Sequence, residues 1–358
     1  KDFIGEIEGF LAILEDRLME FKEIEFRGMT LTEEDLIQLF YYKFTETPLL
    51  KRMDAVKDYF IDSWETLKGR NISEDDQEML QMKFDKMYTT KDIYTIYNWM
   101  LDDCGCDLLP EVPYEKRKLP YEDVFPMLYL KYRLSGGNST HKNIKHLVID
   151  EMQDYSYLQY TILESLFHCR MTILGDRAQT LDTKQQDVLR FLPKLLGREI
   201  RTIEIKKSYR NTLEIARYAE KVSGVSDLEL LDRHGKEVVE KTFNTDTELL
   251  DELVCHLKCP GDFETAALIT TTEEEAFDLS RLLKLRGINV SYVDRNSSAF
   301  KKGLTVTTFY LAKGLEFDQV FALRGAKENP LKNQAEYICA TRALHELYVY
   351  EIADSLSK

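Results

Sequence analysis

Short apolar runs alternate with helix-like stretches through residues 121–351, and this alternation constrains the fold more than any other feature of the sequence. The runs are too short for helices, and the stretches between them repeat apolar side chains at helical spacing. This order is typical of parallel strands joined by crossover helices. Candidate strands are residues 146–150, 171–175, 200–205, 265–270, 304–309, 319–323 and 346–351. Candidate helices are residues 121–134, 156–167, 211–222, 246–258, 273–286 and 331–343.

Residues 1–112 follow a helical pattern almost throughout. Apolar side chains recur there at the spacing of one helix face, and few strand signals interrupt them. Thr32 and Ser73 each precede three acids, as N-cap residues do before a first helical turn. We therefore predict an all-helical domain over residues 1–112, with Pro110 and Pro113 at its exit.

The change of pattern divides the chain into three predicted parts. After the helical domain, residues 113–198 hold the C-terminal part of a first α/β domain, and residues 199–358 hold a complete second one. The polar stretch around Gly197 and Arg198 is the predicted junction between the two sheets. A loop is expected over residues 135–140.

Acidic charge is concentrated in the helical part. The chain has a formal charge of −15, of which −13 falls in residues 1–112. Such a region is unsuited to holding a phosphate backbone, because affinity for nucleic acid comes largely from Lys and Arg side chains. An acidic region can instead bind a basic protein surface or imitate the charge of nucleic acid. The simpler alternative is a solvated acidic surface that has no partner.

The sequence shows neither a membrane span nor a secretory signal. No apolar run approaches the roughly 20 residues of a span, and the N-terminus has no basic-then-apolar pattern, so we expect a cytoplasmic protein. The six cysteines fit reduced thiols in that compartment. The spacings of Cys104 with Cys106 and of Cys255 with Cys259 lack a matching second pair, so no zinc site is predicted.

Asp150 and Glu151 directly follow the apolar run 147–149. Ligands of open α/β sheets bind beyond the carboxyl ends of the strands. One carboxylate there can hold the water shell of Mg2+, and the next can polarise a water for attack on a nucleoside triphosphate. Two acids also end ordinary buried strands, so the pair alone leaves both interpretations open.

Other polar segments at strand ends and helix ends suit the same chemistry. Gly175 and Asp176 end the second apolar run, and the amide of Gln179 suits a γ-phosphate or an attacking water. Arg210 precedes one predicted helix, and Arg342 lies near the end of another. Two arginines that converge on a γ-phosphate can stabilise the charge of the transition state. Each of these residues, taken alone, also has an ordinary structural explanation.

The segment 306–318 combines a strand end with a polar turn. The turn contains Lys313 and Gly314, and Glu316 precedes the next strand. A loop of this kind can contact both a nucleotide and a polymer, so nucleic acid is a candidate ligand of residues 303–317.

Together, these segments resemble motifs II to VI of superfamily 1 helicases of the UvrD/Rep type, in that family's order, over residues 121–351. The resemblance implies an α/β fold of RecA-like parallel sheets of the P-loop NTPase type, one partial and one complete, after the helical domain. It also implies ATP and Mg2+ as cofactors and a helicase-like ATP hydrolase as the enzyme class.

The resemblance also implies a role for each matching residue. Asp150 and Glu151 would bind Mg2+ and activate water, and Gln179 would contact the γ-phosphate. Arg210 and Arg342 would act as arginine fingers from the second RecA-like domain.

Motif V differs from the family in part. Glu316 would contact the nucleotide ribose, and Gly314 would shape the loop, as the resemblance implies. The family's histidine, however, is replaced by Tyr310, and Thr180 follows Gln179 where the family has an aromatic residue for stacking on single strands. Two residue types that the family uses for unwinding are therefore missing at these positions.

The phosphate-binding loop is missing from the sequence. No G-x-x-x-x-G-K-[ST] pattern occurs, and residues 136–142 do not form one because no glycine precedes the lysine. Without the loop there is no backbone cradle for the phosphates. We therefore expect a fragment of a longer ATPase that hydrolyses ATP poorly by itself.

The reduced motifs and the acidic helical segment are similar to the HelD-like branch of this family. That resemblance implies a motor that acts on RNA polymerase to release or recycle it, with residues 1–112 as an insertion that reaches into a basic channel. Two alternatives remain open. One is a fragment of a UvrD/Rep-type DNA helicase acting on single-stranded DNA, and the other is a non-catalytic protein-interaction module that has lost its phosphate loop.

Overall fold

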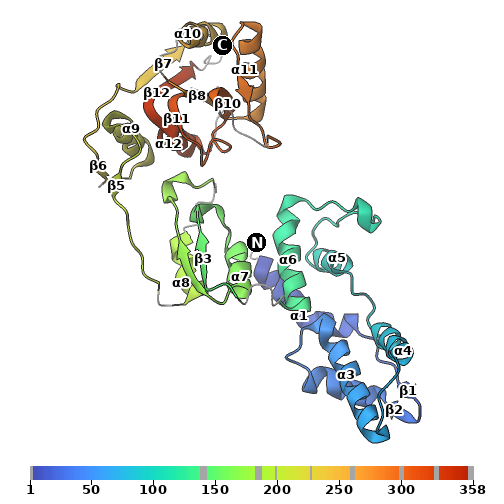
Figure 1. Cartoon of the computed structure of the whole chain (residues 1–358). Helices are drawn as coiled ribbons and strands as arrows, with labels where there is room; N and C mark the ends of the chain where they lie inside the picture. Colours follow the sequence, from blue (N-terminus) through green and yellow to red (C-terminus); the bar gives the residue numbers. More distant parts are fainter. Residues whose placement is uncertain are drawn as a thin grey trace. The chain divides into compact units, whose positions relative to one another are not determined.

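The computed structural model describes residues 3–137, 143–181, 188–197, 200–225, 228–258, 263–297, 302–325 and 330–353. The chain divides into two compact units (Figure 1). Unit 1 comprises Lys1–Val148 and Tyr155–Thr172, and unit 2 comprises Ile149–Asp154 and Ile173–Lys358. Part of the predicted loop (residues 138–140), Arg198 of the predicted junction and Cys259 lie outside the described residues.

Unit 1 is mainly helical. Its α-helices are α1 (Phe3–Leu18), α2 (Glu33–Gln38), α3 (Leu49–Lys68), α4 (Glu74–Asp85), α5 (Ile93–Asp103), α6 (Tyr121–Ser135) and α7 (Tyr157–Leu166). Both predicted N-caps are confirmed: the side chain of Thr32 accepts a hydrogen bond from Asp35 N at 3.2 Å, and that of Ser73 accepts one from Asp76 N at 3.3 Å. These bonds satisfy backbone donors that a helix start otherwise leaves free.

A short hairpin interrupts the helices of unit 1. Strands β1 (Ile24–Phe26) and β2 (Met29–Leu31) pair in antiparallel fashion. The turn residues Arg27 and Gly28 have φ values of 45° and 80°, as a tight two-residue hairpin turn requires. The prediction of an all-helical domain over residues 1–112 is wrong at this hairpin, because strands of three residues are too short to show an alternating pattern.

One apolar core holds unit 1 together. It joins side chains of α1, α3, α4, α5 and α6, and its largest fully buried members include Phe40, Phe60, Trp64, Phe84 and Tyr97. Burying a large apolar side chain contributes about 1.5–3 kcal/mol to folding, so this core stabilises the helical part without help from the sheet of unit 2.

A six-stranded parallel sheet forms the centre of unit 2, as the alternating pattern predicts. Its strand order is β7-β12-β11-β8-β10-β9, and every pairing is parallel. The strands are β7 (Val239–Phe243), β8 (Thr265–Thr270), β9 (Ser291–Tyr292), β10 (Gly303–Thr308), β11 (Phe317–Arg324) and β12 (Ala343–Ile352).

Helices cover both faces of this sheet, which gives unit 2 its RecA-like α/β architecture. The helices are α9 (Leu213–Ser223), α10 (Asp246–Lys258), α11 (Glu273–Leu285) and α12 (Lys332–Arg342). Ile269 of β8 packs in one core with α9 and α12, whereas its neighbour Leu268 packs in the other core with α10 and α11. Successive residues of a strand face opposite sides, so a strand covered on both faces reads as a continuous apolar run.

Smaller elements precede this sheet. Strands β3 (His146–Ile149) and β4 (Arg170–Ile173) form a two-stranded sheet, and β5 (Lys207–Ser208) pairs with β6 (Glu229–Leu230). A helix, α8, spans Val188–Leu196. The strand predicted over residues 200–205 is wrong: no strand forms among residues 200–206, and Ile203 and Ile205 are exposed. Alternating apolar residues form a strand only where a neighbouring strand takes up their backbone hydrogen bonds.

Candidate functional site

Asp150 and Glu151 lie directly after β3. The backbone passes next to β4, where Leu174 N donates to Ile149 O and Met152 N donates to Leu174 O, both at 2.8 Å. Glu151 has φ 52°, a left-handed conformation that is strained in residues other than glycine by roughly 1–2 kcal/mol. The turn holds this strain because Glu151 N donates to Asp150 Oδ1 at 2.8 Å and Glu151 O accepts from Asp154 N at 2.9 Å.

Gln153 connects Glu151 to the turn after β4. Its Nε2 donates to Glu151 Oε2 at 2.6 Å, and its Oε1 accepts from Asp176 N at 3.0 Å. Both ends of this buried amide are therefore satisfied. The Glu151 carboxylate is held in one orientation as a result.

Gly175 is needed at this point for steric reasons. A Cβ atom there would lie 2.5 Å from Gln153 Oε1, 2.5 Å from Met152 Cγ and 2.7 Å from Met152 N. Only glycine lets the β4 turn approach the Asp150-Glu151 turn so closely.

Gln179 lies in a 3-10 turn, Arg177–Gln179, whose first backbone donors are capped by Asp176. Its Nε2 donates to Asp176 Oδ2 at 2.9 Å, and its Oε1 accepts from Arg342 Nη2 at 3.1 Å. Tyr337 OH donates to the same Asp176 oxygen at 2.8 Å. Two of the predicted site residues, Gln179 and Arg342, thus contact each other directly.

Arg342 is the most deeply buried of the predicted arginines, at 3% exposure. Burial lowers the pKa of its guanidinium, and the charge of Arg210 lowers it further, whereas the carboxylates of Glu151 and Glu316 act in the opposite direction. Arginine nevertheless stays protonated in proteins. Besides Gln179 it donates to Leu315 O at 3.3 Å.

Arg210 pairs with Glu316, another predicted site residue. Arg210 Nε lies 2.7 Å from Glu316 Oε1, and both side chains are close to half exposed. The next residue, Asn211, is buried and donates to Ala340 O at 3.2 Å and to Ala343 O at 2.6 Å. These two bonds anchor the Arg210 turn to the end of α12, which also carries Arg342.

Lys313 lies opposite the acids of the β3 turn. Its Nζ donates to Asp154 Oδ1 at 2.6 Å and to Gln179 O at 3.2 Å, and it lies 3.7 Å from Glu151 Oε2. The Lys313 side chain is 8% exposed. One ammonium group therefore offsets part of the charge of the Asp154 and Glu151 carboxylates in this arrangement.

The rest of the motif V turn is also defined. Gly314 has φ 83°, the left-handed region that glycine adopts most easily. Tyr310, which stands in place of the family's histidine, donates from its hydroxyl to Glu273 Oε1 at 2.9 Å, and Arg295 Nε lies 2.6 Å from the same oxygen.

The donor set of the β3 turn suits Mg2+ chemically. Asp150 is exposed, and its carboxylate and that of Glu151 are the hard oxygen ligands that Mg2+ takes beside phosphate oxygens and water. Among the described residues, no group of three or more His, Cys, Asp or Glu side chains is arranged to hold a metal ion. Two carboxylates are sufficient when a bound nucleotide supplies the other oxygens.

The hydrogen bonds of the site involve several residues to which the sequence analysis gave no role. They are Gln153, Asp154, Asp176, Asn211, Lys313 and Tyr337. Gln153 and Asp154 belong to the D-E-M-Q-D string and Lys313 to the K-G-L-E string, so spacing within the motifs was the available signal. Tyr337 had no signal, because an aromatic residue in an apolar helix is usually a core residue.

In the part of the chain that the structure describes, no helix is long and apolar enough to cross a membrane.

Comparison with known proteins gives one family match and several structural likenesses. The sequence model of the UvrD/REP helicase N-terminal domain matches residues 14–181. No curated protein matches the sequence.

Three solved structures with similar coordinates carry the word helicase in their descriptions. The C-terminal domain of a possible DNA helicase from Lactobacillus plantarum WCFS1 is 25% identical, with 40% of this chain and 88% of that chain covered and a TM-score of 0.33. The PRRSV helicase is 16% identical, with 74% and 46% covered and a TM-score of 0.35. Arterivirus nonstructural protein 10 (helicase), in complex with DNA, is 17% identical, with 34% and 29% covered and a TM-score of 0.25.

This chain spans less than half of the two viral helicases. The family match covers the Asp150-Glu151 turn and Gln179. Residues 14–181 are therefore similar to the N-terminal domain of UvrD/REP helicases.

Proposed function

We propose that this chain carries part of the ATP-hydrolysing site of a helicase-like motor. A hydrogen-bond chain supports the proposal: Glu151 accepts from Gln153, Gln153 accepts from Asp176, Asp176 accepts from Gln179, and Gln179 accepts from Arg342. It connects the acid expected to activate water with the arginine expected to stabilise the transition state.

Each residue in the site then has a distinct role. Glu151 orients and polarises the attacking water, and Gln153 fixes the carboxylate that does so. Arg342 supplies positive charge to the γ-phosphate, while Gln179 holds its guanidinium in place. Mg2+ held by Asp150 and Glu151 would neutralise charge on the phosphate oxygens when bound.

Arg210 is the second proposed finger. In this arrangement its guanidinium pairs with Glu316, which we expect to bind the ribose. Binding of a nucleotide would separate this exposed pair, and little stability is lost because such surface pairs contribute only about 0–1 kcal/mol.

The sequence lacks the phosphate-binding loop that ATP hydrolysis requires. We propose that a segment outside these 358 residues supplies the loop, so that the chain by itself is deficient in ATP hydrolysis.

The roles are tested in a longer protein that contains the phosphate loop. We compare ATP hydrolysis of the wild type with Glu151→Gln and Arg342→Ala, and use Arg286→Ala, an exposed arginine on α11's C-terminal side, as the matched control. Both site variants should lose on the order of 10³-fold in rate, whereas the control should not change. Rates within a factor of about three of the wild type for both variants would show that the roles are assigned wrongly.

We further propose RNA polymerase as the partner of the acidic helical part. The first turn of α2 presents the exposed acids Glu33 and Glu34, and that of α4 presents Glu74 and Asp75, within a segment whose formal charge is −13. Acidic side chains on a helical element can compete with nucleic acid for a basic channel. Opposite charges at an interface speed association and add specificity.

Charge reversal tests this partner. Glu33→Lys with Glu34→Lys should weaken capture of purified RNA polymerase, and Glu274→Lys with Asp278→Lys, two exposed acids of α11, is the control with the same change of charge. Equal capture by both double variants would remove the polymerase proposal. Binding to single-stranded DNA with a steep dependence on salt would favour the DNA helicase alternative instead.

A further inference from the structure

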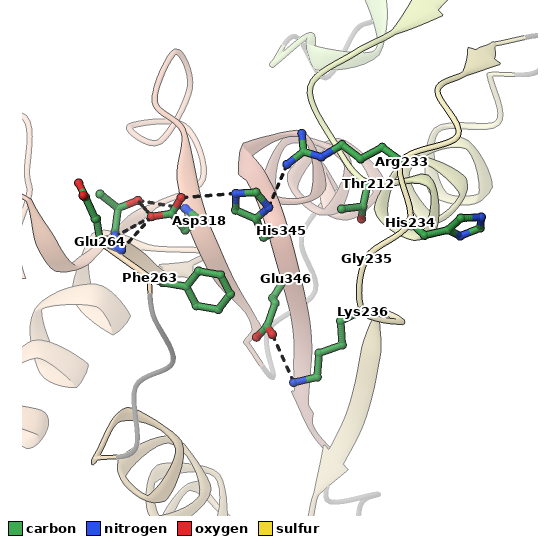
Figure 2. A pocket seen from close by; sticks show the side chains of 11 residues that line it. Thr212, Arg233, His234, Gly235, Lys236, Phe263, Glu264, Asp318, His345 and Glu346 are labelled. Atoms are coloured by element: carbon green, nitrogen blue, oxygen red, sulfur yellow. Dashed lines mark hydrogen bonds and ion pairs between the residues drawn. The ribbon is translucent and has the colours of Figure 1, made fainter.

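A cavity of about 700 Å³ opens in unit 2 beside the turn that follows Arg210 (Figure 2). Its wall includes Thr212, Arg233, Lys236, Phe263, His345 and Glu346. None of the sequence-predicted site residues lines it within the described part of the chain. Cavities of about 300–1,000 Å³ are the size that takes a small molecule.

Arg233 brings positive charge to this wall without a matching carboxylate. Its Nη1 donates to Arg210 O at 3.1 Å, and its Nη2 lies 2.9 Å from His345 Nδ1. Because a guanidinium only donates, Nδ1 is the accepting nitrogen of this contact. Among the residues that the structure describes, no carboxylate forms an ion pair with Arg233.

The acids on the same wall are already paired. Asp318 Oδ2 accepts from Glu264 N at 3.1 Å, from Thr265 N at 2.9 Å and from Thr265 Oγ1 at 2.9 Å. Glu346 accepts from Gln319 Nε2 at 2.8 Å and lies 3.5 Å from Lys236 Nζ. Lys236 therefore offsets the charge of Glu346, and neutral donors hold Asp318 in place. Arg233 is the guanidinium on this wall that no described carboxylate pairs.

Two further features of the wall suit a planar ligand. Phe263 and His345 stack with ring centroids 6.0 Å apart and an angle of 14° between the rings, which gives a flat surface. The Thr212 hydroxyl is buried, and it has no hydrogen-bond partner in the described structure. A buried hydroxyl without a partner costs about 1–3 kcal/mol, so a ligand atom that reaches it would be favoured.

We propose that this cavity binds a small molecule that carries one anionic group, a phosphate or a carboxylate, beside one planar ring. The anion pairs with the Arg233 guanidinium, for which bidentate recognition of phosphate or carboxylate is the preferred geometry. The ring lies against Phe263 and His345.

Occupancy of the cavity is linked to the Arg210 turn. Arg233 would have to share its donors between the ligand and the Arg210 carbonyl, and the backbone of Leu213 is bonded to Arg233 O at 2.8 Å. A bound anion therefore changes the contacts that hold residues 210–213. The consequence of this link for ATP hydrolysis rests on the proposed function of Arg210, whereas binding itself does not.

Calorimetric titration of the 358-residue chain tests the binding site. The probes are phenyl phosphate and benzoate, which carry both features, inorganic phosphate, which lacks the ring, and phenol, which lacks the charge. We expect one of the two aromatic anions to bind at least 10-fold more tightly than phosphate or phenol, and the better one identifies the anionic group. No binding of either aromatic anion at millimolar concentration, or equal binding of phosphate alone, would overturn the proposal.

Two variants assign the binding to this wall. Arg233→Gln should weaken binding of the aromatic anion at least 10-fold. Arg286→Gln, the same change at an exposed arginine outside the cavity, should leave this affinity unchanged. Phe263→Leu should weaken binding of the aromatic anion but not binding of inorganic phosphate. If Arg233→Gln does not fold, Phe263→Leu alone tests whether the ligand binds at this wall. Unchanged affinity in the folded variants would place the ligand elsewhere.

Hydrogen exchange tests the link to Arg210. Addition of the aromatic anion should change the exchange rates of backbone amides in residues 210–213 in the wild type and not in Arg233→Gln. Unchanged rates at saturating ligand would refute the link, and since no ATP hydrolysis is measured, this result is independent of the proposed function.

Discussion

Arg342 donates to the side-chain oxygen of Gln179 at 3.1 Å, although 163 residues separate the two in sequence. The bond is buried, and Gln179 at the same time donates to Asp176 at 2.9 Å. The Gln179 carboxamide thus joins Arg342 to Asp176, with its oxygen bonded to the first and its nitrogen to the second. This relationship underlies the first prediction.

Removing both partners of the Gln179–Arg342 bond should reveal their coupling. Either Gln179→Ala or Arg342→Ala leaves a buried polar group without its partner, which costs about 1–3 kcal/mol of unfolding free energy. The double variant should lose less than the sum, with a coupling of about 0.5–3 kcal/mol. Urea denaturation of the four proteins measures it, and a coupling near zero would show that the bond does not contribute.

The exposed pair Arg210–Glu316 is the matched comparison. Both side chains are close to half exposed, so solvent screens their attraction. The corresponding cycle of Arg210→Ala and Glu316→Ala should give a coupling of no more than about 1 kcal/mol. A larger coupling here than for Gln179–Arg342 would contradict the assignment of the buried bond as the stronger one.

Gly175→Ala should destabilise unit 2. The added methyl would lie 2.5 Å from Gln153 Oε1 and 2.7 Å from the backbone nitrogen of Met152, so the Asp150-Glu151 turn must shift. Overpacking of this kind costs about 1–3 kcal/mol. Gly9→Ala is the control, because its methyl would meet no atom within 4 Å and α1 favours alanine. The midpoint of thermal unfolding should fall for Gly175→Ala and stay unchanged for Gly9→Ala.

Two cysteines should differ strongly in reactivity. Burial raises the pKa of the Cys339 thiol to about 12, with the charge of Glu336 adding to the effect, so the thiol stays protonated at pH 8. Cys255 is exposed. Because the thiolate is the reactive form, iodoacetamide should label Cys255 in the folded protein and Cys339 only in urea. Mass spectrometry of the peptides measures this, and equal labelling in the folded state would refute the burial of Cys339.

The ion pair of Glu214 and His234 should titrate outside the usual ranges. The hydrogen bond from His234, followed by backbone amides, lowers the pKa of the Glu214 carboxyl to about 2, and that bond together with Asp232 raises the pKa of His234 above 6.5. The Glu214 contribution to stability is present above its unfolded pKa and is lost as pH falls toward 2. The His234 contribution is complete below 6.5 and is lost as pH rises through the raised pKa.

Substitution of one partner tests this pair. Glu214→Gln should move the pKa of His234 back toward 6.5, because the first cause of the shift is removed. A proton NMR titration of the His234 ring measures the change. The same titration in Glu240→Gln, an exposed glutamate outside the pair, should reproduce the wild type. An unaltered His234 in Glu214→Gln would show that Asp232 alone sets the shift.

ATP hydrolysis by the 358-residue chain itself should be absent or very slow. The sequence has the acids, glutamine and arginines proposed for the site but no G-x-x-x-x-G-K-[ST] pattern, which supplies backbone amides and a lysine to the phosphates. A phosphate-release assay with Mg2+ measures this, with Glu151→Gln as the background control. Rapid turnover that Glu151→Gln abolishes would show that the chain binds the phosphates in another way.

Much of the architecture is predictable from sequence, because a strand that is buried on both faces appears in the sequence as a continuous apolar run. The β8 run predicts a strand without knowledge of its neighbours, and the acids after Thr32 and Ser73 predict helix starts. The candidate site residues were also visible as strings at strand ends. Their order along the chain resembles that of motifs II to VI in UvrD/Rep-type helicases, whose N-terminal domain model matches residues 14–181.

Only the tertiary structure decided which of these residues touch. The contacts of Gln179 with Arg342 and of Lys313 with Asp154 join segments more than a hundred residues apart, and no local pattern records a partner at that distance. Residues 200–205, for which a strand was expected from sequence, form none in the described structure. The local sequence therefore determines most helices and strands of this protein, whereas tertiary packing determines which residues of the candidate site are in contact.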